Sequence, residues 1–127
     1  SFSGTTGLIV VAATGNNGDA GGSSGISSPA CAENVTAVGA TTKADAVASF
    51  SDSNSLLDLL APGQTITTAS ITGQYEAVSG TSFSTPIVSG AIALMIETSR
   101  ALNSSNLTRS QIIDTLNSSG KQITDTR

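Results

Sequence analysis

Apolar residues form short continuous runs in the first half of the chain. The runs at residues 8–13 and 35–41 lie between stretches rich in Gly, Asn and Ser. This pattern is typical of strands buried on both faces of a parallel sheet. Further strands are predicted at 48–51 and 56–60, the second stopped by the turn signal Ala61-Pro62-Gly63. Alternating β-branched segments between 65 and 78, broken at Thr72-Gly73, predict a hairpin.

In the second half of the chain the spacing becomes helical. Residues 86–100 are apolar nearly all round, so this helix should lie inside the protein. Pro86 would fall in its first turn, where a missing N–H is tolerated. A second helix is predicted with Thr108 as N-cap and Gln111 at the third position, a capping box. Its apolar face consists of Ile112, Ile113 and Leu116, and Gly120 follows its end.

The order of these elements is that of an incomplete α/β domain. Strands come first and both helices follow, so a sheet built from this chain alone would lack helices on one face. A parallel sheet needs cover on both faces. We therefore expect residues 1–127 to be part of a larger domain, with open apolar surface that promotes self-association.

Composition and charge exclude several classes of partner. Five Lys and Arg stand against nine Asp and Glu, and the formal net charge of −4 argues against nucleic acid. No apolar run approaches the ~18 residues of a membrane span, and no signal peptide is visible. Low charge and abundant Ser and Thr favour a secreted or extracellular protein. The sequence contains no histidine, so no imidazole base can come from these residues.

Two stretches carry the candidate chemistry, Val11-Ala12-Ala13-Thr14-Gly15-Asn16-Asn17-Gly18 and Gly80-Thr81-Ser82-Phe83-Ser84-Thr85-Pro86. In the second stretch a hydroxyl stands between small residues at the start of a buried helix. The helix dipole and the free N–H groups of the first turn favour an anion there. Acyl transfer through an oxyanion has these requirements. Taken alone, Ser82 is also explained as an N-cap, and residues 15–18 as a turn.

Together, the two stretches resemble the subtilisin-like serine peptidases. Gly-Thr-Ser-x-[Ser/Ala]-Thr-Pro before an apolar, small-residue helix is the nucleophile signature of that family. Ala-Ala-x-Gly-Asn-x-Gly after an apolar strand is similar to its oxyanion-hole segment. Segments at 29–40, 48–51 and 57–63 also look like family segments in the family order. The resemblance covers about 8–116 and implies a partial subtilisin-like three-layer α/β fold, with parallel strands, a hairpin and a central buried helix.

The resemblance also implies roles for individual residues. Ser82 would attack the scissile carbonyl of a protein or peptide substrate, and its own N–H would be one oxyanion donor. The side-chain amide of Asn16 would be the second donor. Thr81 would shape the rim on the leaving-group side. One wall of the pocket for the substrate residue before the scissile bond would consist of Ala13, Thr14 and Gly15.

Asp58 is the candidate metal ligand, because a carboxylate inside an apolar strand is costly unless it is paired or bound to a metal. In some family members the matching Asp and carbonyls near 29–32 bind calcium or a monovalent cation, which fits hard-oxygen ligation. The alternative is that Asp58 accepts hydrogen bonds from backbone N–H groups and holds no ion. The chemistry requires no cofactor, and calcium would be structural.

The sequence departs from the family pattern in several places. The catalytic Asp and His of the family lie on segments before the matching region. Lys43 and Lys121 would serve only a Ser–Lys mechanism, and neither lies in a family motif. Ile87 stands where the family commonly has a non-catalytic His. Because the chain stops at Arg127, before a Gly-rich closing segment, we expect a C-terminal portion of a single catalytic domain, incomplete at both ends and released by a trypsin-like cut.

The sequence thus predicts a fragment of a serine endopeptidase that forms its acyl-enzyme on Ser82 and is inactive alone. Its partner would be the missing N-terminal half of the catalytic domain. The competing interpretation is a non-catalytic relic of the family, acting as a binding or structural module. Intact Ser82 and Asn16 count against a relic. A secreted β-rich adhesion module would explain the composition but neither motif.

Overall fold

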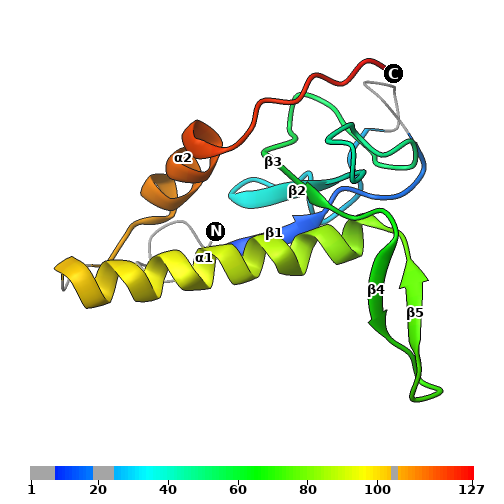
Figure 1. Ribbon diagram of the computed structural model, residues 1–127. Helices are drawn as coiled ribbons and strands as arrows, with labels where there is room; N and C mark the ends of the chain where they lie inside the picture. Colours follow the sequence, from blue (N-terminus) through cyan, green and yellow to red (C-terminus); the bar gives the residue numbers. More distant parts are fainter. Residues whose placement is uncertain (1–7, 19–24, 104–105) are drawn as a thin grey trace.

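The structure is a computed structural model that describes residues 8–18, 25–103 and 106–127. It contains a parallel sheet, an antiparallel hairpin and two helices (Figure 1). The elements in chain order are β1 (Val10–Ala13), β2 (Val35–Thr41), β3 (Leu59–Pro62), β4 (Ile66–Ala69), β5 (Tyr75–Val78), α1 (Thr81–Asn103) and α2 (Arg109–Ser119). The mixed α/β architecture expected from the sequence is confirmed.

The parallel sheet has the order β1-β2-β3, with β2 in the centre. Val10 pairs with Val35 and Ala13 with Val38, while Val38 also pairs with Leu59 on the other side. Parallel strands bring their carboxyl ends to the same edge of a sheet. The turn after β1 and the turn after β3 therefore lie along one edge, and α1 begins there because Gly80 N donates to Gly63 O at 2.8 Å.

The two faces of the sheet are covered differently. On one face Val38 and Ala61 form the core with residues of both helices, Val88, Ile92, Ile112 and Ile113. The other face carries the small side chains of Ala12 and Ala37, covered by Ile26 and Ala30 from the segment before β2. In the described part of the chain no helix covers this second face. The expected one-sided helical cover is therefore present.

Helix α1 begins earlier than the sequence predicted. The expected start at residue 86 was wrong, because Thr81–Asn103 is one helix and Pro86 lies inside it, beyond its first turn. The polar residues before Pro86 are weak helix formers and hid the true start. Val88 and Ile92 of α1 are buried against the sheet, whereas Ile87, Leu94 and Leu102 stay exposed. The expected open apolar surface lies along this side of the helix.

Two predicted strands need correction. Residues 48–51 form a turn, and the nearest sheet contact is an isolated bridge between Thr41 and Val47. The reason is that Ala40 N donates to the Ser51 side chain at 2.9 Å, so a hydroxyl replaces a backbone acceptor. The strand expected at 56–60 is shifted to Leu59–Pro62, because Leu57 N closes a turn on Asn54 O.

The hairpin and the second helix agree with the sequence. Strands β4 and β5 pair around a turn in which Gly73 has a φ of 79°, and the hairpin extends away from the sheet (Figure 1). The capping box of α2 is present, with Thr108 Oγ1 accepting from Gln111 N at 3.3 Å and Gln111 Oε1 accepting from Thr108 N at 2.9 Å. None of the helices among the described residues has the length and apolar character needed to cross a membrane.

Replacing Thr108 by Ala should destabilise the chain by about 1 kcal/mol, because the hydroxyl that accepts from Gln111 N at the start of α2 is lost. Urea unfolding of the purified protein measures this difference. Ser110→Ala, at an exposed position in the same turn, is the matched control and should change the free energy of unfolding by less than about 0.5 kcal/mol. Equal stability of the two variants would contradict a stabilising cap at Thr108.

Candidate active site

Ser82 is exposed in the first turn of α1, at the sheet edge where β1 also ends. The first N–H groups of a helix have no partners within the helix. Those of Thr81 and Phe83 donate to Asn16 Oδ1 and to Gly80 O, and that of Ser82 lies between them. A Cβ added to the buried Gly80 would lie 3.2 Å from Ser82 Oγ and 3.5 Å from Asn16 Nδ2. The hydroxyl and the amide therefore border the same small space, which glycine leaves open.

Thr81 fixes the orientation of the Asn16 amide. Asn16 Oδ1 accepts hydrogen bonds from Thr81 N and from Thr81 Oγ1, both at 2.9 Å. Two donors on the amide oxygen leave Nδ2 as the free end, facing the space beside Gly80. Thr81 itself is 1% exposed, so the donor side of these bonds is buried. The role expected for Thr81 at the leaving-group rim stays a prediction.

Gly15 lies between Thr81 and Asp52. Its N–H donates to Thr81 Oγ1 at 3.3 Å, and its φ is 116°, a conformation that favours glycine. A Cβ at this position would overlap the carboxylate of Asp52. No other residue type fits this position without movement of its neighbours.

The remaining residues of the predicted pocket wall lie just before Gly15. Ala13 is half-buried at the end of β1, whereas Thr14 is fully buried. The backbone of Thr14 is bonded on both sides, its N–H to Val38 O and its carbonyl to Ser27 N. Because the Thr14 side chain points into the protein, it contributes only backbone to a wall. The role of these residues as a substrate pocket stays a prediction.

Asp52 is a part of the site that the sequence analysis missed. It is fully buried, and its Oδ1 accepts from Asn17 N at 2.9 Å. Its own N–H donates to Gly15 O at 3.0 Å. Asp52 is therefore hydrogen-bonded to the backbone on both sides of Asn16, which carries the candidate oxyanion amide. The only signal in the sequence was an acidic residue among serines in a chain with few charges, which also describes an ordinary surface loop.

Ser84 attaches the start of α1 to the end of β3. Its buried Oγ donates to Ala61 O at 3.0 Å and approaches Pro62 O at 3.3 Å. A Cβ on Gly63 would overlap this hydroxyl. Packing at this junction thus requires glycine at position 63, and the junction positions Ser82.

Asp58 is held by backbone hydrogen bonds. Its Oδ2 accepts from Ala37 N at 2.8 Å, and its N–H donates to Ala37 O at 3.1 Å. The carbonyls of Pro29 and Ala32 each accept a backbone N–H. Among the residues that the structure describes, no three His, Cys, Asp or Glu gather to hold a metal. The bond to Ala37 accounts for the carboxylate without an ion, and calcium stays a prediction.

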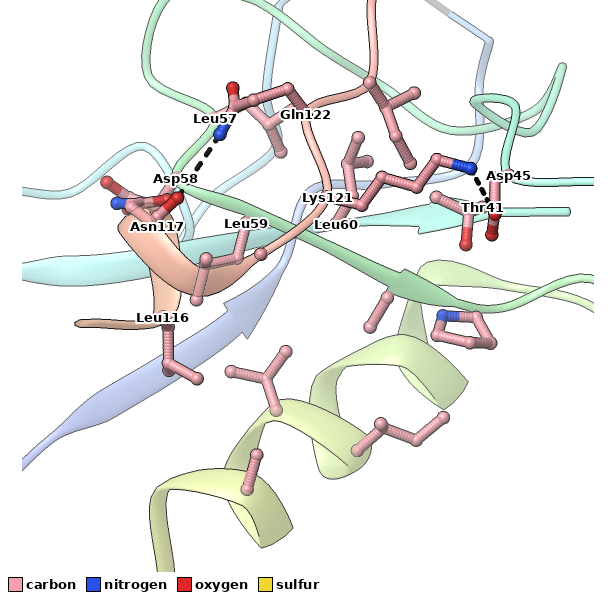
Figure 2. Close-up of a pocket in the computed structure, with 17 residues that line it drawn as sticks. Thr41, Asp45, Leu57, Asp58, Leu59, Leu60, Leu116, Asn117, Lys121 and Gln122 are labelled. Atoms are coloured by element: carbon pink, nitrogen blue, oxygen red, sulfur yellow. Dashed lines mark hydrogen bonds and ion pairs between the residues drawn. The ribbon is translucent and has the colours of Figure 1, made fainter. Parts of the chain in front are cut away.

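A separate cavity of about 560 Å³ lies between β3, α1 and the segment after α2 (Figure 2). Leu59, Val88 and Leu116 form part of its apolar wall, and neither Ser82 nor Asn16 lines it. Lys121 forms an ion pair with Asp45 at 2.7 Å on the rim of the cavity. Lys121 is therefore bound to a carboxylate at a different place from the candidate nucleophile.

Comparison with known proteins identifies the family. The sequence model of the Subtilase family matches residues 2–127 of this chain. The chain belongs to the subtilase family. This subtilase is 44% identical to the subtilisin of Bacillus pumilus over 92 residues, which are 72% of this chain and 34% of that protein. It is 40% identical to proteinase R of Parengyodontium album over 94 residues, 74% of this chain and 23% of that protein.

Solved structures agree with the sequence comparison. A cold-adapted subtilisin-like serine proteinase matches with a TM-score of 0.73 and 40% identity, over 91% of this subtilase and 40% of that chain. The prenylagaramide maturation protease PagA matches with a TM-score of 0.77 and 32% identity, over 90% and 41%. The predicted subtilisin-like fold is therefore confirmed. This subtilase spans about a third or less of the length of the curated relatives that it matches.

Gly15→Ala should destabilise this subtilase by more than about 1 kcal/mol, since the new Cβ meets the Asp52 carboxylate at a φ that L-residues disfavour. Thermal or urea unfolding measures the loss. Gly90→Ala is the control, because α1 has open space there and Ala is the better helix former by up to about 1 kcal/mol. A Gly15→Ala variant as stable as the parent chain would rule out the tight contact with Asp52.

Proposed function

We propose that this chain provides the nucleophile and the oxyanion hole of a secreted serine endopeptidase, which hydrolyses peptide bonds of proteins or peptides through an acyl-enzyme on Ser82. The observation that carries the proposal is the pair of hydrogen bonds from Thr81 to Asn16 Oδ1. They leave the Asn16 amide N–H groups directed at the space that Ser82 Oγ also borders. Family membership supports the reaction class.

The reaction needs hydrogen-bond donors at the position where negative charge develops. When Ser82 Oγ attacks the scissile carbonyl, the carbonyl oxygen becomes an oxyanion that Asn16 Nδ2 and Ser82 N–H can bind together. The start of α1 adds the positive end of its dipole. Because Thr81 fixes the amide before substrate binds, these dipoles need no reorganisation during the reaction. A non-catalytic relic would have no use for such an arrangement.

The proton of Ser82 must leave to a group outside these residues. The sequence has no histidine, and Lys121 is bound to Asp45. We infer that residues 1–127 are the C-terminal portion of one catalytic domain and that an N-terminal portion supplies the Asp and His. In subtilisin, loss of the histidine alone is known to lower kcat by about 10⁶. The isolated chain should therefore show no proteolysis.

Ala13, Thr14 and Gly15 would form one wall of the pocket for the substrate residue that precedes the scissile bond. Gly15 lacks a side chain and the Thr14 side chain is buried, so this wall would be made chiefly of backbone. A backbone wall leaves room for a large substrate side chain. A structural calcium near Asp58 would be compatible with this function but takes no part in it.

A fluorophosphonate probe tests the nucleophile. The isolated chain should gain no adduct in its intact mass, because no base activates Ser82. A complete enzyme with the His-bearing portion should be labelled on a peptide containing Ser82, and Ser82→Ala should abolish labelling. Ser89→Ala, an exposed serine on the same helix, should label normally. An adduct on Ser82 in the isolated chain would refute the inferred lack of a base, and an unlabelled complete enzyme would refute the nucleophile.

Steady-state kinetics of the complete enzyme test the oxyanion hole. Asn16→Ala should lower kcat with little change in KM; loss of one such donor in subtilisin is known to cost about 10²–10³. Thr81→Val keeps the shape but removes a donor from Asn16 Oδ1, so kcat should fall by about tenfold. Ser89→Ala again serves as the control. A kcat unchanged by Asn16→Ala would remove the oxyanion role from this residue.

A further inference from the structure

The side chain of Arg127 is bound to the turn that contains Asp52. Its Nη1 donates to the carbonyls of Ala48 at 2.9 Å and Ser51 at 2.8 Å, and approaches Ser49 O at 3.2 Å. Nη2 donates to Ser53 Oγ at 3.1 Å. The side chain is only 21% exposed, which is low for an arginine at a surface. The guanidinium thus binds several acceptors of the segment 48–53.

Asp125 holds the guanidinium in place. Its two oxygens accept from Nε at 2.9 Å and from Nη2 at 2.6 Å, a bidentate pair, and Ser53 Oγ donates to Asp125 Oδ2 at 2.7 Å. The hydrogen bonds from Arg127 keep the pKa of Asp125 well below its usual range. The carboxylate accordingly stays charged. All the nitrogens of Arg127 are engaged, so the contact has a defined geometry.

The opposite side of the same turn holds the candidate oxyanion segment. Asp52 Oδ1 accepts from Asn17 N, Asp52 N donates to Gly15 O, and Gly18 N donates to Phe50 O at 2.8 Å. Residues 48–53 therefore lie between the Arg127 side chain and residues 15–18. The hydrogen bond to Asp125 raises the pKa of Arg127, and the charge of Asp52 adds a smaller effect in the same direction.

We propose that Arg127 is a positioning residue: by binding the carbonyls of residues 48–53 it fixes Asp52 and, through Asp52, the turn from which Asn16 projects. Thr81 orients the amide of Asn16 from one side, and the Asp52 turn fixes its backbone from the other. The structural coupling stands on the hydrogen bonds alone. Its catalytic consequence rests on the proposed function of Asn16.

Amide hydrogen exchange on the purified protein tests the coupling directly. In Arg127→Gln the amides of Asn17 and Gly18 should exchange about tenfold faster, because their acceptors are on the turn that loses its donor. The amide of Ile112, in the core of α2, should be unchanged. Arg127→Lys keeps the charge but not the bidentate geometry, so it should restore exchange only in part.

Lys121→Gln is the matched control. It removes a cation from the same terminal segment, but its ion pair with Asp45 is exposed at 69% and 55% and does not contact residues 48–53. Exchange at Asn17 and Gly18 should stay at the level of the parent chain in this variant. Unchanged exchange in Arg127→Gln, or equal acceleration in Lys121→Gln, would overturn the coupling.

Kinetics of the complete enzyme then separate this inference from the proposed function. Arg127→Gln should lower kcat by about tenfold at unchanged KM, the pattern of a transition-state interaction. Faster exchange with unchanged kcat would overturn the catalytic consequence if Asn16→Ala lowers kcat in the same assay. If Asn16→Ala also leaves kcat unchanged, the proposed oxyanion role of Asn16 fails, and the exchange result alone decides whether Arg127 fixes the turn.

Discussion

Two hydrogen bonds from Thr81 to the amide oxygen of Asn16 join segments that lie 65 residues apart in the sequence. Most of the neighbouring geometry is arranged around this contact. Gly15 bends with a positive φ to bring Asn16 there, and Gly80 lacks the side chain that would fill the space between amide and nucleophile. Ser84 attaches the start of α1 to the end of β3 so that Thr81 stays in register with the turn after β1.

The parallel sheet makes this contact possible, because it places both turns at one edge. Strand β2 is the common neighbour: Val38 pairs with Ala13 on one side and with Leu59 on the other. Reversing the direction of β1 or of β3 alone would send its turn to the opposite edge. The buried strands therefore contribute to the chemistry by setting which loops meet, although their own side chains take no part.

The elements that the sequence predicted well are those with a strong local signal. The continuous apolar run of β2 and the capping box at Thr108 are visible without tertiary context, and both are present. The start of α1 was not predictable, since its first residues are polar and are helical only because the sheet edge receives them. Family motifs located Ser82 and Asn16, but Asp52 has meaning only through a contact with Asn17, which is distant in sequence. Arg127 was missed for the same reason, because its acceptors are main-chain carbonyls, which every residue type has.

The unequal cover of the two sheet faces limits which substitutions the sheet can accept. On the face without helices, Ala12 and Ala37 pack directly under Ile26 and Ala30, and Ser27 in the same segment donates to the carbonyl of Thr14. A larger residue at either alanine would lift this covering segment and pull on the strand end that leads to Asn16. The substitutions that Ala12 and Ala37 tolerate are therefore limited by the active-site turn that they support. Although their methyl groups are far from any reacting atom, they set the distance between the sheet and the covering segment.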